Sequence, residues 1–433
     1  MNVPYYPSHG GANRTNRSLL EGLAARGHAV SVVAPSLGTP PRNTNDEVRQ
    51  LLSDRGVALD SHADYDSYTL DGVRVCAVVT PGQLAPALQR ELAMSRADVV
   101  LASSEDPSQL ILRTLLECGT APVVYIGHTP VLLPFGPFSF FASPARRDLL
   151  ARTAARIAVS EYVHDYFRDW GGMGSTVLNL YNFEPAASEV ARRHYRGFIT
   201  LINPCTIKGI SIFSELARSL PGLPFAAVPT WGTTSEDLQR LAAIENVTLL
   251  SPVDDVREIF RQTRLLLVPS LCGEAYGRVA VEALVDGLPV LVSDFGGLRE
   301  AVQEPAFRVP VRPIEGFSTR LDENMIPVPV VPSQDVEPWA LAIKSMLESE
   351  SVYQHHVRRA RRLGETTAPT HDWAQVEEFF ERVSMEEPMI VHAGTTVEQR
   401  EQRGLAVEQD QKRSLLAAIL ARRASTAKGD AES

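Results

Sequence analysis

The chain has 433 residues, 44% of them apolar and 22% charged, and a net charge of −10 at neutral pH. This length exceeds the size at which one hydrophobic core keeps growing, so two domains are expected in a globular protein. The acidic balance argues against general affinity for nucleic acid, and no apolar run is long enough to cross a membrane.

Apolar, β-branched segments alternate with helical patterns through most of the chain, which is typical of βα units around parallel sheets. In the first half we predict strands at 28–35, 73–80, 97–102, 122–127, 156–160 and 176–181. In the second half we predict strands at 198–203, 225–229, 247–250, 265–269, 289–293 and 307–311.

A polar stretch without strand character, residues 184–197, separates the two halves and is the predicted linker. Two doubly wound halves joined in this way leave a cleft between them, and ligands bind at the carboxyl ends of such strands. Beyond about residue 383 the chain is rich in Gln, Glu and Arg, which predicts an extra helix or a disordered tail.

The four cysteines lie far apart, without the spacing of a zinc site or a disulfide framework, so reduced thiols are expected. The N-terminus also lacks the basic and apolar regions of a secretory signal. Both features predict a cytoplasmic location.

The strongest motif is PSLCGEAYGRVAVEALVDGLPVLVSDFGGLREAV at 269–302. It predicts a buried strand, a glycine-containing loop, and a helix that starts near Tyr276 and Gly277. Such a helix start offers free N–H groups and a positive dipole end to a pyrophosphate. Glu274 before the helix can accept hydrogen bonds from sugar hydroxyls, and Glu282 within it can accept both hydroxyls of a ribose. In a purely structural interpretation, these glutamates are a helix cap and a solvated side chain.

This motif resembles the E-x7-E signature of family-4 retaining glycosyltransferases. Four further segments resemble elements of that family in the same order: 7–35 with its glycine loop, YIGHTP around His128, IAVSEYVHDYF with NLYN, and Lys208-Gly209. The match covers about residues 1–385. It implies an α/β GT-B fold, with two Rossmann-like domains facing across a cleft.

The resemblance also implies a division of the chain. It consists of an N-terminal acceptor domain (1–183), the linker (184–197), a C-terminal donor domain (198–370), a helix crossing back to the N-terminal domain (371–386) and the tail (387–433).

The resemblance assigns roles to individual residues. Lys208 would neutralise the leaving diphosphate, Glu274 would hold the donor sugar, and His128 would lie near that sugar. The alternatives are a solvated turn lysine and a packing histidine. The remaining donor contacts implied are Gly10, Gly11, Ala275, Tyr276, Gly277, Arg278 and Glu282, whereas the turn Phe295–Gly297 is as compatible with structure as with binding.

The sequence departs from the family at Asn203, where an arginine five positions before the lysine of the KG motif is usual. Asn203 remains a predicted donor contact, and Arg278 and Arg14 are candidates to replace the missing positive charge. Lys208 is one of only four lysines among 42 basic residues, which favours a selected point charge at this position.

An apolar loop at 130–144, PVLLPFGPFSFFASP, follows His128 directly. We expect it to border the acceptor site, because such an apolar surface loop often marks binding. Packing under the loop as a separate cluster is an equal alternative, and contact with a membrane surface is a weaker one. The predicted acceptor contacts are Phe135, Phe138 and Phe140.

The implied activity is metal-independent, retaining transfer from a nucleotide-diphosphate sugar, UDP-linked among the candidates, to a hydroxyl of a small molecule or glycan. No cofactor is expected, and a bacterial natural product is a plausible acceptor. An inverting transferase using His9 or His128 as base, a phosphorylase or epimerase, and a catalytically impaired sugar-nucleotide-binding partner are the alternatives. The C-terminal tail is also a candidate segment for oligomerisation.

Overall fold

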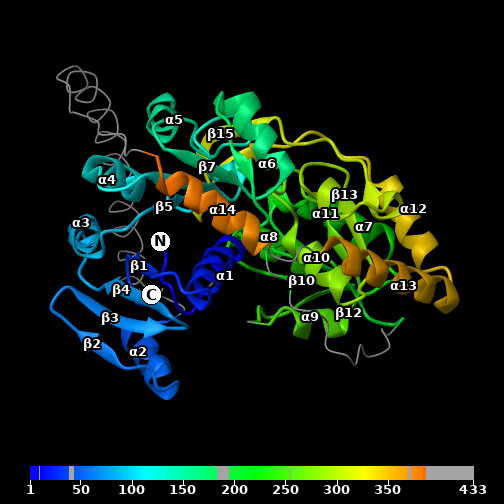
Figure 1. Ribbon diagram of the computed structural model, residues 1–433. Helices are drawn as coiled ribbons and strands as arrows, with labels where there is room; N and C mark the ends of the chain where they lie inside the picture. Colours follow the sequence, from blue (N-terminus) through cyan, green and yellow to red (C-terminus); the bar gives the residue numbers. More distant parts are fainter. Residues whose placement is uncertain are drawn as a thin grey trace, which may run out of the picture. The chain divides into compact units, whose positions relative to one another are not determined.

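The structure is a computed structural model that describes residues 1–8, 10–38, 43–181, 183, 195–253, 255–368 and 372–386 (Figure 1). The chain divides into two compact units, Met1–Met389 and Ile390–Ser433. The second unit lies outside the described residues, as do the predicted tail, most of the predicted linker and His9. The domain boundaries stay predictions.

The N-terminal half contains two sheets. In the first, the strand order is β1-β4-β3-β2, with β1 (Ser31–Ala34) parallel to β4 (Val73–Val78). The strands β3 (Tyr65–Leu70) and β2 (Leu59–Ser61) continue this sheet in antiparallel fashion. The second sheet is wholly parallel and consists of β5 (Val100–Ser103), β6 (Val123–Gly127), β7 (Ala155–Ala158) and β8 (Thr176–Val177).

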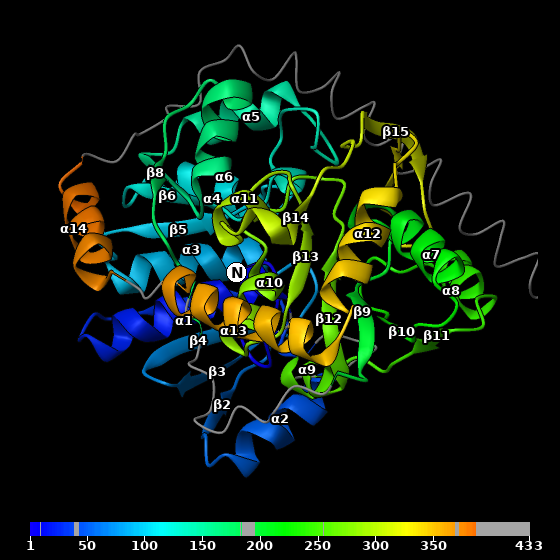
Figure 2. The same ribbon diagram turned by 90° about the vertical axis from the view of Figure 1, so that its right-hand side faces the viewer.

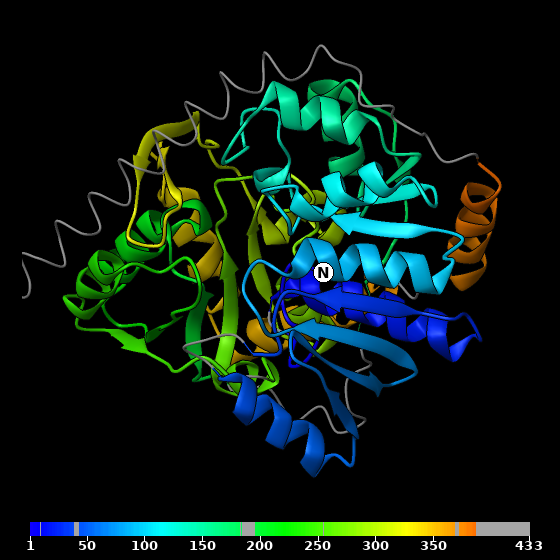
Figure 3. The same cartoon turned by 90° about the vertical axis from the view of Figure 1, so that its left-hand side faces the viewer.

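Helices connect these strands. The helix α3 (Leu84–Ser95) packs beside α4 (Leu110–Cys118) and against β1, and Figure 3 shows α3 alongside the strands of this half. Apolar residues of α4 such as Leu112, Leu115 and Leu116 are buried, as its spacing of leucines predicts. The helices of this half are α1 (Gly11–Ala25), α2 (Asn45–Asp54), α3 (Leu84–Ser95), α4 (Leu110–Cys118), α5 (Pro144–Ala151) and α6 (Glu161–Tyr166).

The C-terminal half is built on one six-stranded parallel sheet of order β11-β10-β9-β12-β13-β14. Every residue of the central strand β12 (Thr263–Val268) is buried, including Thr263 and Arg264 before its apolar run from Leu265 to Val268. The strands are β9 (Phe198–Ile202), β10 (Phe225–Val228), β11 (Val247–Leu249), β12 (Thr263–Val268), β13 (Val290–Ser293) and β14 (Arg308–Val309).

The helix α13 packs against α10, as Figure 2 shows. A Cβ added at Gly364 would lie 2.5 Å from the backbone of Leu284, so the glycine permits this approach. The helices of this half are α7 (Ile210–Ser219), α8 (Ser235–Ala242), α9 (Arg257–Gln262), α10 (Arg278–Val285), α11 (Leu298–Ala301), α12 (Glu337–Met346) and α13 (Glu350–Thr367).

The last described helix, α14 (Trp373–Ser384), packs on α1 of the N-terminal half. Glu377 accepts hydrogen bonds from Arg26, the shorter of them 2.6 Å long, and the Trp373 ring lies against Gly22. None of the described helices is long and apolar enough to cross a membrane.

All twelve predicted strands overlap an observed strand, and the predicted α/β class is confirmed. Four observed strands were missed: β2, β3, β15 (Gly316–Leu321) and β16 (Pro327–Val330). They are antiparallel and largely polar or proline-containing, so they lack the apolar runs on which the predictions depended.

Candidate functional site

Lys208 and Glu274 meet because their strands are neighbours. Lys208 ends a short 3-10 helix after β9, and Glu274 lies in the loop after β12, the strand that pairs with β9. Lys208 Nζ lies 2.5 Å from Glu274 Oε1, and Ser270 donates its hydroxyl to the same oxygen. The carboxyl edge of the sheet thus joins a cation and an anion that are 66 residues apart in the chain.

Both partners of this pair are charged at neutral pH. Burial lowers the pKa of Lys208, but the adjacent Glu274 carboxylate outweighs it and the net pKa is raised. Burial raises the pKa of Glu274, yet Lys208 and the Ser270 hydrogen bond bring it below its ordinary value. A charged ammonium, paired with a carboxylate, therefore lies at the carboxyl edge of the sheet.

Glycines bring the surrounding loops close together. A Cβ at Gly209, whose φ is 80°, would lie 2.0 Å from the carbonyl oxygen of Pro269. A Cβ at Gly297 would lie 2.1 Å from the carbonyl oxygen of Ala275, and the N–H of Gly297 donates to the backbone carbonyl of Glu274. Gly209 and Gly297 thus have a structural role in supporting the Glu274 loop.

Arg278, the first residue of α10, connects this motif to the N-terminal glycine loop. Its Nε donates to Glu282 Oε1 at 3.1 Å, and its Nη1 donates to the Gly11 carbonyl and the Thr15 hydroxyl, each at 3.1 Å. The preceding Gly277 has a φ of 90°, and a Cβ there would lie 2.4 Å from the Leu298 side chain.

A pocket with a volume of about 200 Å³ surrounds Arg278 and Glu282. Its walls come from both halves of the described chain, which is expected for a ligand site in this type of fold. The lining residues are Arg14, Phe183, Asp255, Val256, Arg257, Arg278, Glu282 and Val285.

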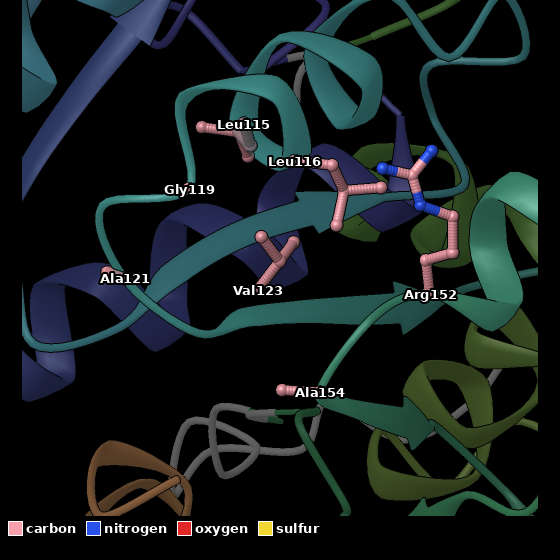
Figure 4. A pocket seen from close by; sticks show the side chains of 7 residues that line it. All are labelled: Leu115, Leu116, Gly119, Ala121, Val123, Arg152 and Ala154. Atoms are coloured by element: carbon pink, nitrogen blue, oxygen red, sulfur yellow. The ribbon is translucent and has the colours of Figure 1, made fainter. Parts of the chain in front are cut away.

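A second pocket, shown in Figure 4, has a volume of about 10 Å³, roughly the room that one water molecule needs. Its residues Val123 and Ala154 lie at the amino ends of β6 and β7, at the opposite edge of the sheet from His128. It is therefore not a candidate ligand site.

His128 follows β6 and is 4% exposed. Asn16 donates its amide to Ser103, so its Oδ1 faces the imidazole and accepts from His128 Nε2 at 2.6 Å. Burial, together with the nearby Arg278 charge, lowers the pKa of His128 to about 3. The imidazole is neutral at pH 7 and is a weak base.

Asn203 lies at the end of β9 in a left-handed conformation with a φ of 59°. Its Oδ1 accepts from the Gly232 amide at 3.1 Å, whereas its buried Nδ2 has no hydrogen-bond partner among the described residues. In the N-terminal glycine loop, Gly10 has a φ of 85° and directly precedes α1.

The ring of Tyr276, a predicted donor contact, packs on the ring of Tyr181, with ring centroids 5.1 Å apart.

Two family models match the chain: Glycosyltransferase Family 4 over residues 9–177 and Glycosyl transferases group 1 over residues 208–349. A D-inositol 3-phosphate glycosyltransferase of Nocardia farcinica is 36% identical over 111 residues, which cover 23% of this chain and 24% of that protein. A phosphatidyl-myo-inositol mannosyltransferase of Mycolicibacterium smegmatis is 23% identical over 415 residues, covering 89% and 93%. The first relatives are matched over less than half of their own length.

Solved structures agree on the architecture. An Anabaena protein, HepE, in complex with UDP and glucose superimposes with a TM-score of 0.60 at 17% identity, covering 89% of this chain and all of that chain. A glycosyltransferase of Rickettsia africae gives a TM-score of 0.60 at 12% identity, covering 89% and 97%. The chain has the GT-B glycosyltransferase fold.

In this GT-B chain the predicted acceptor loop packs within a set of aromatic rings. Phe135 is 5% exposed and packs on Phe167, with ring centroids 5.7 Å apart, so it belongs to the core. Phe138 and Phe140 are only half-buried. We therefore base the acceptor proposal on Phe138 and Phe140.

Sequence analysis missed several residues at the contact between the start of α6 and the region of the Glu274 loop. Ser160 donates to the Ala275 carbonyl at 2.5 Å, and Glu300 accepts from the amides of Glu161 and Tyr162. The Tyr162 hydroxyl lies 1.8 Å from the position of a Cβ added at Gly273. The segment IAVSEYVHDYF, already noted for its resemblance, was the available signal, but its contacts depend on tertiary structure.

Proposed function

We propose that this chain is a retaining, metal-independent glycosyltransferase that moves a sugar from a nucleoside diphosphate to a hydroxyl of a small molecule or glycan. The observation that carries the proposal is the Lys208–Glu274 pair at the carboxyl edge of the six-stranded sheet. It combines a cation suited to a diphosphate with a carboxylate suited to sugar hydroxyls. The likeness to a protein bound to UDP and glucose adds support.

In the proposed reaction, the bond between the sugar C1 and the diphosphate oxygen breaks, and a bond from C1 to the acceptor oxygen forms on the same face. The acceptor proton passes to the departing diphosphate. Negative charge grows on the diphosphate as the bond breaks, and Lys208 stabilises that charge. Donor binding exchanges the Lys208–Glu274 contact for contacts with the diphosphate and the sugar.

Arg278 supplies a second positive charge in this proposal and takes the place of the arginine that Asn203 replaces. It lies beside Glu282 in the 200 Å³ pocket and reaches the Gly11 carbonyl. Glu282 would bind the ribose, and the backbone at Gly10 and Gly11 would approach the phosphates. Because the neutral His128 donates its Nε2–H to Asn16, its Nδ1 would accept a hydrogen bond near the sugar rather than serve as a general acid.

One observation favours an inverting alternative with Glu105 as the base, in place of His9 or His128. Glu105 follows Ser104, whose hydroxyl accepts the His128 amide at 3.0 Å, so it lies at the same sheet edge. Burial raises the pKa of Glu105 to about 7, a value suited to a general base. An inverting enzyme would use this carboxylate to take the acceptor proton.

The anomeric configuration of the product, read by NMR, tests the proposal. Thermal shifts with UDP-, GDP- and ADP-sugars would first select the donor. A product with the donor's configuration, together with near-normal turnover of Glu105→Gln, is expected. An inverted product and an inactive Glu105→Gln variant would replace the retaining mechanism with the inverting one.

A further inference from the structure

The hairpin β15–β16 lies outside the parallel sheets and forms a two-stranded sheet of its own. Its strands pair at Gly316 with Val330, at Phe317 with Pro329 and at Leu321 with Pro327. The prolines cannot donate to the ladder, so this pairing alone is weak. Contacts at its base and its tip hold the hairpin in place.

The base of the hairpin is hydrogen-bonded to the loop that carries Glu274. The amide of Ile314, a residue that is 3% exposed, donates to the carbonyl of Leu271 at 2.9 Å. Leu271 stands three residues before Glu274 in the same loop. The tip is attached to the loop after β10, where Asn324 donates to Thr233 at 3.3 Å.

The hairpin also contacts the loop that follows His128. The rings of Phe317 and Phe140 meet edge to face, with centroids 5.0 Å apart. In the same loop, Phe138 meets Phe295 of the glycine turn at 5.6 Å. The loop after His128 thus makes two ring contacts, one with the hairpin and one with the glycine turn.

Further ring contacts lead from Phe295 towards Glu274. Phe295 lies 6.2 Å from Tyr162, and the Tyr162 hydroxyl contacts Gly273, next to Glu274. That hydroxyl is buried and has no hydrogen-bond partner among the described residues. We name the five rings the aromatic layer: Tyr162, Phe295, Phe138, Phe140 and Phe317.

The members of the aromatic layer differ from core rings in their exposure. Each of the five is half-buried, whereas Phe135 and Phe167 beneath them are buried. Phe141, which adjoins Phe140, is 44% exposed. Each ring of the layer therefore retains some accessible apolar surface, from Tyr162 beside the Glu274 loop to Phe317 on the hairpin.

We infer that the aromatic layer binds the acceptor, and that the acceptor carries a flat apolar body, such as an aromatic aglycone, next to the hydroxyl that is glycosylated. This inference rests on the proposed function. A hydroxyl that reaches a sugar held at Glu274 leaves the rest of the acceptor along the layer, where ring edges and faces favour an aromatic group. The Tyr162 hydroxyl is available to bond an oxygen at the inner end.

Two matched acceptors test the inference: methyl β-D-glucoside and phenyl β-D-glucoside, which present the same hydroxyls. Their binding is measured by NMR in the presence of the nucleoside diphosphate that best stabilises the chain. We expect the phenyl glucoside to bind at least about tenfold more tightly, as expected for burying one ring among others. Equal binding of the two glucosides, or binding of neither, would overturn the inference.

Variants locate the effect. Phe317→Leu and Phe138→Leu keep apolar volume but remove the ring, and each should reduce the preference for the phenyl glucoside at least threefold while nucleotide affinity stays unchanged. Leu341→Ser, at a 58% exposed position on α12, is the control and should leave the preference intact. A lower melting temperature with unchanged preference would identify the rings as core and refute the inference. Failure of every nucleotide to bind would refute the proposed function itself.

Discussion

The proposed donor side and the proposed acceptor side of the site are built in different ways. On the donor side, short motifs place charged groups at the ends of neighbouring parallel strands, as Lys208 and Glu274 illustrate. On the acceptor side, half-buried rings from separate segments meet through packing, as Phe140 and Phe317 do. Because the donor side depends on charge and the acceptor side depends on shape, the two sides should respond differently to substitution.

The largest effect is expected at Lys208. Lys208→Ala removes the cation that faces the growing charge, so turnover should fall about 100-fold or more, with a smaller change in donor affinity. Steady-state kinetics with the selected donor measures both. The exposed Lys344 on α12 provides the matched control, Lys344→Ala. Near-normal turnover of Lys208→Ala would place diphosphate stabilisation elsewhere.

The next effect is expected at Glu282. Glu282→Ala removes the proposed ribose acceptor, and donor affinity should weaken by about 1.5–3 kcal/mol, roughly 10- to 150-fold in Kd. Calorimetry with the nucleotide sugar measures this change. Glu365→Ala, at an exposed position on α13, should bind normally. Unchanged affinity of Glu282→Ala would exclude the ribose role.

A pH effect on folding is expected from His128. Its pKa is about 3 in the folded chain, below the ordinary value of 6.5, so only the unfolded chain takes up this proton as the pH falls below 6.5. The contribution of the neutral imidazole to stability is present above pH 6.5 and is lost as the pH falls towards 3. At pH 5 the loss should be roughly 2 kcal/mol.

Urea denaturation at pH 7 and pH 5 measures the His128 effect. His128→Gln should flatten the pH dependence by this amount, whereas His62→Gln, at a surface position, should not change it. An identical pH dependence in His128→Gln and the unmodified chain would contradict the neutral, buried imidazole.

The smallest effect concerns the geometry of Arg278. Arg278→Lys keeps the charge but loses the fork that reaches Glu282, Gly11 and Thr15 together. Donor affinity should weaken by about 1 kcal/mol, roughly fivefold, because lysine cannot reproduce the planar contacts. Arg361→Lys on α13 is the control. If Arg278→Ala binds the donor as well as Arg278→Lys does, Arg278 does not contact the diphosphate.

The sequence by itself determined the α/β class and the positions of the twelve predicted strands, and its resemblance to family 4 drew attention to Lys208 and Glu274. Apolar runs mark buried parallel strands, and each run is local in the sequence, so the strand positions could be predicted. The contact between Lys208 and Glu274 depends on the pairing of β9 with β12, which are not consecutive in the chain and which the sheet order brings together.

Only the tertiary structure decided the state of His128, the link from Arg278 to Gly11, and the aromatic layer. A histidine is neutral or charged according to its burial, and the sequence alone does not give that burial. The sequence does not distinguish Phe135 from Phe138 and Phe140. In the structure, Phe135 is in the core and the other two rings are half-buried. Phe295 and Phe317, which face them, lie more than 150 residues away in the chain, and no local pattern predicts such pairings.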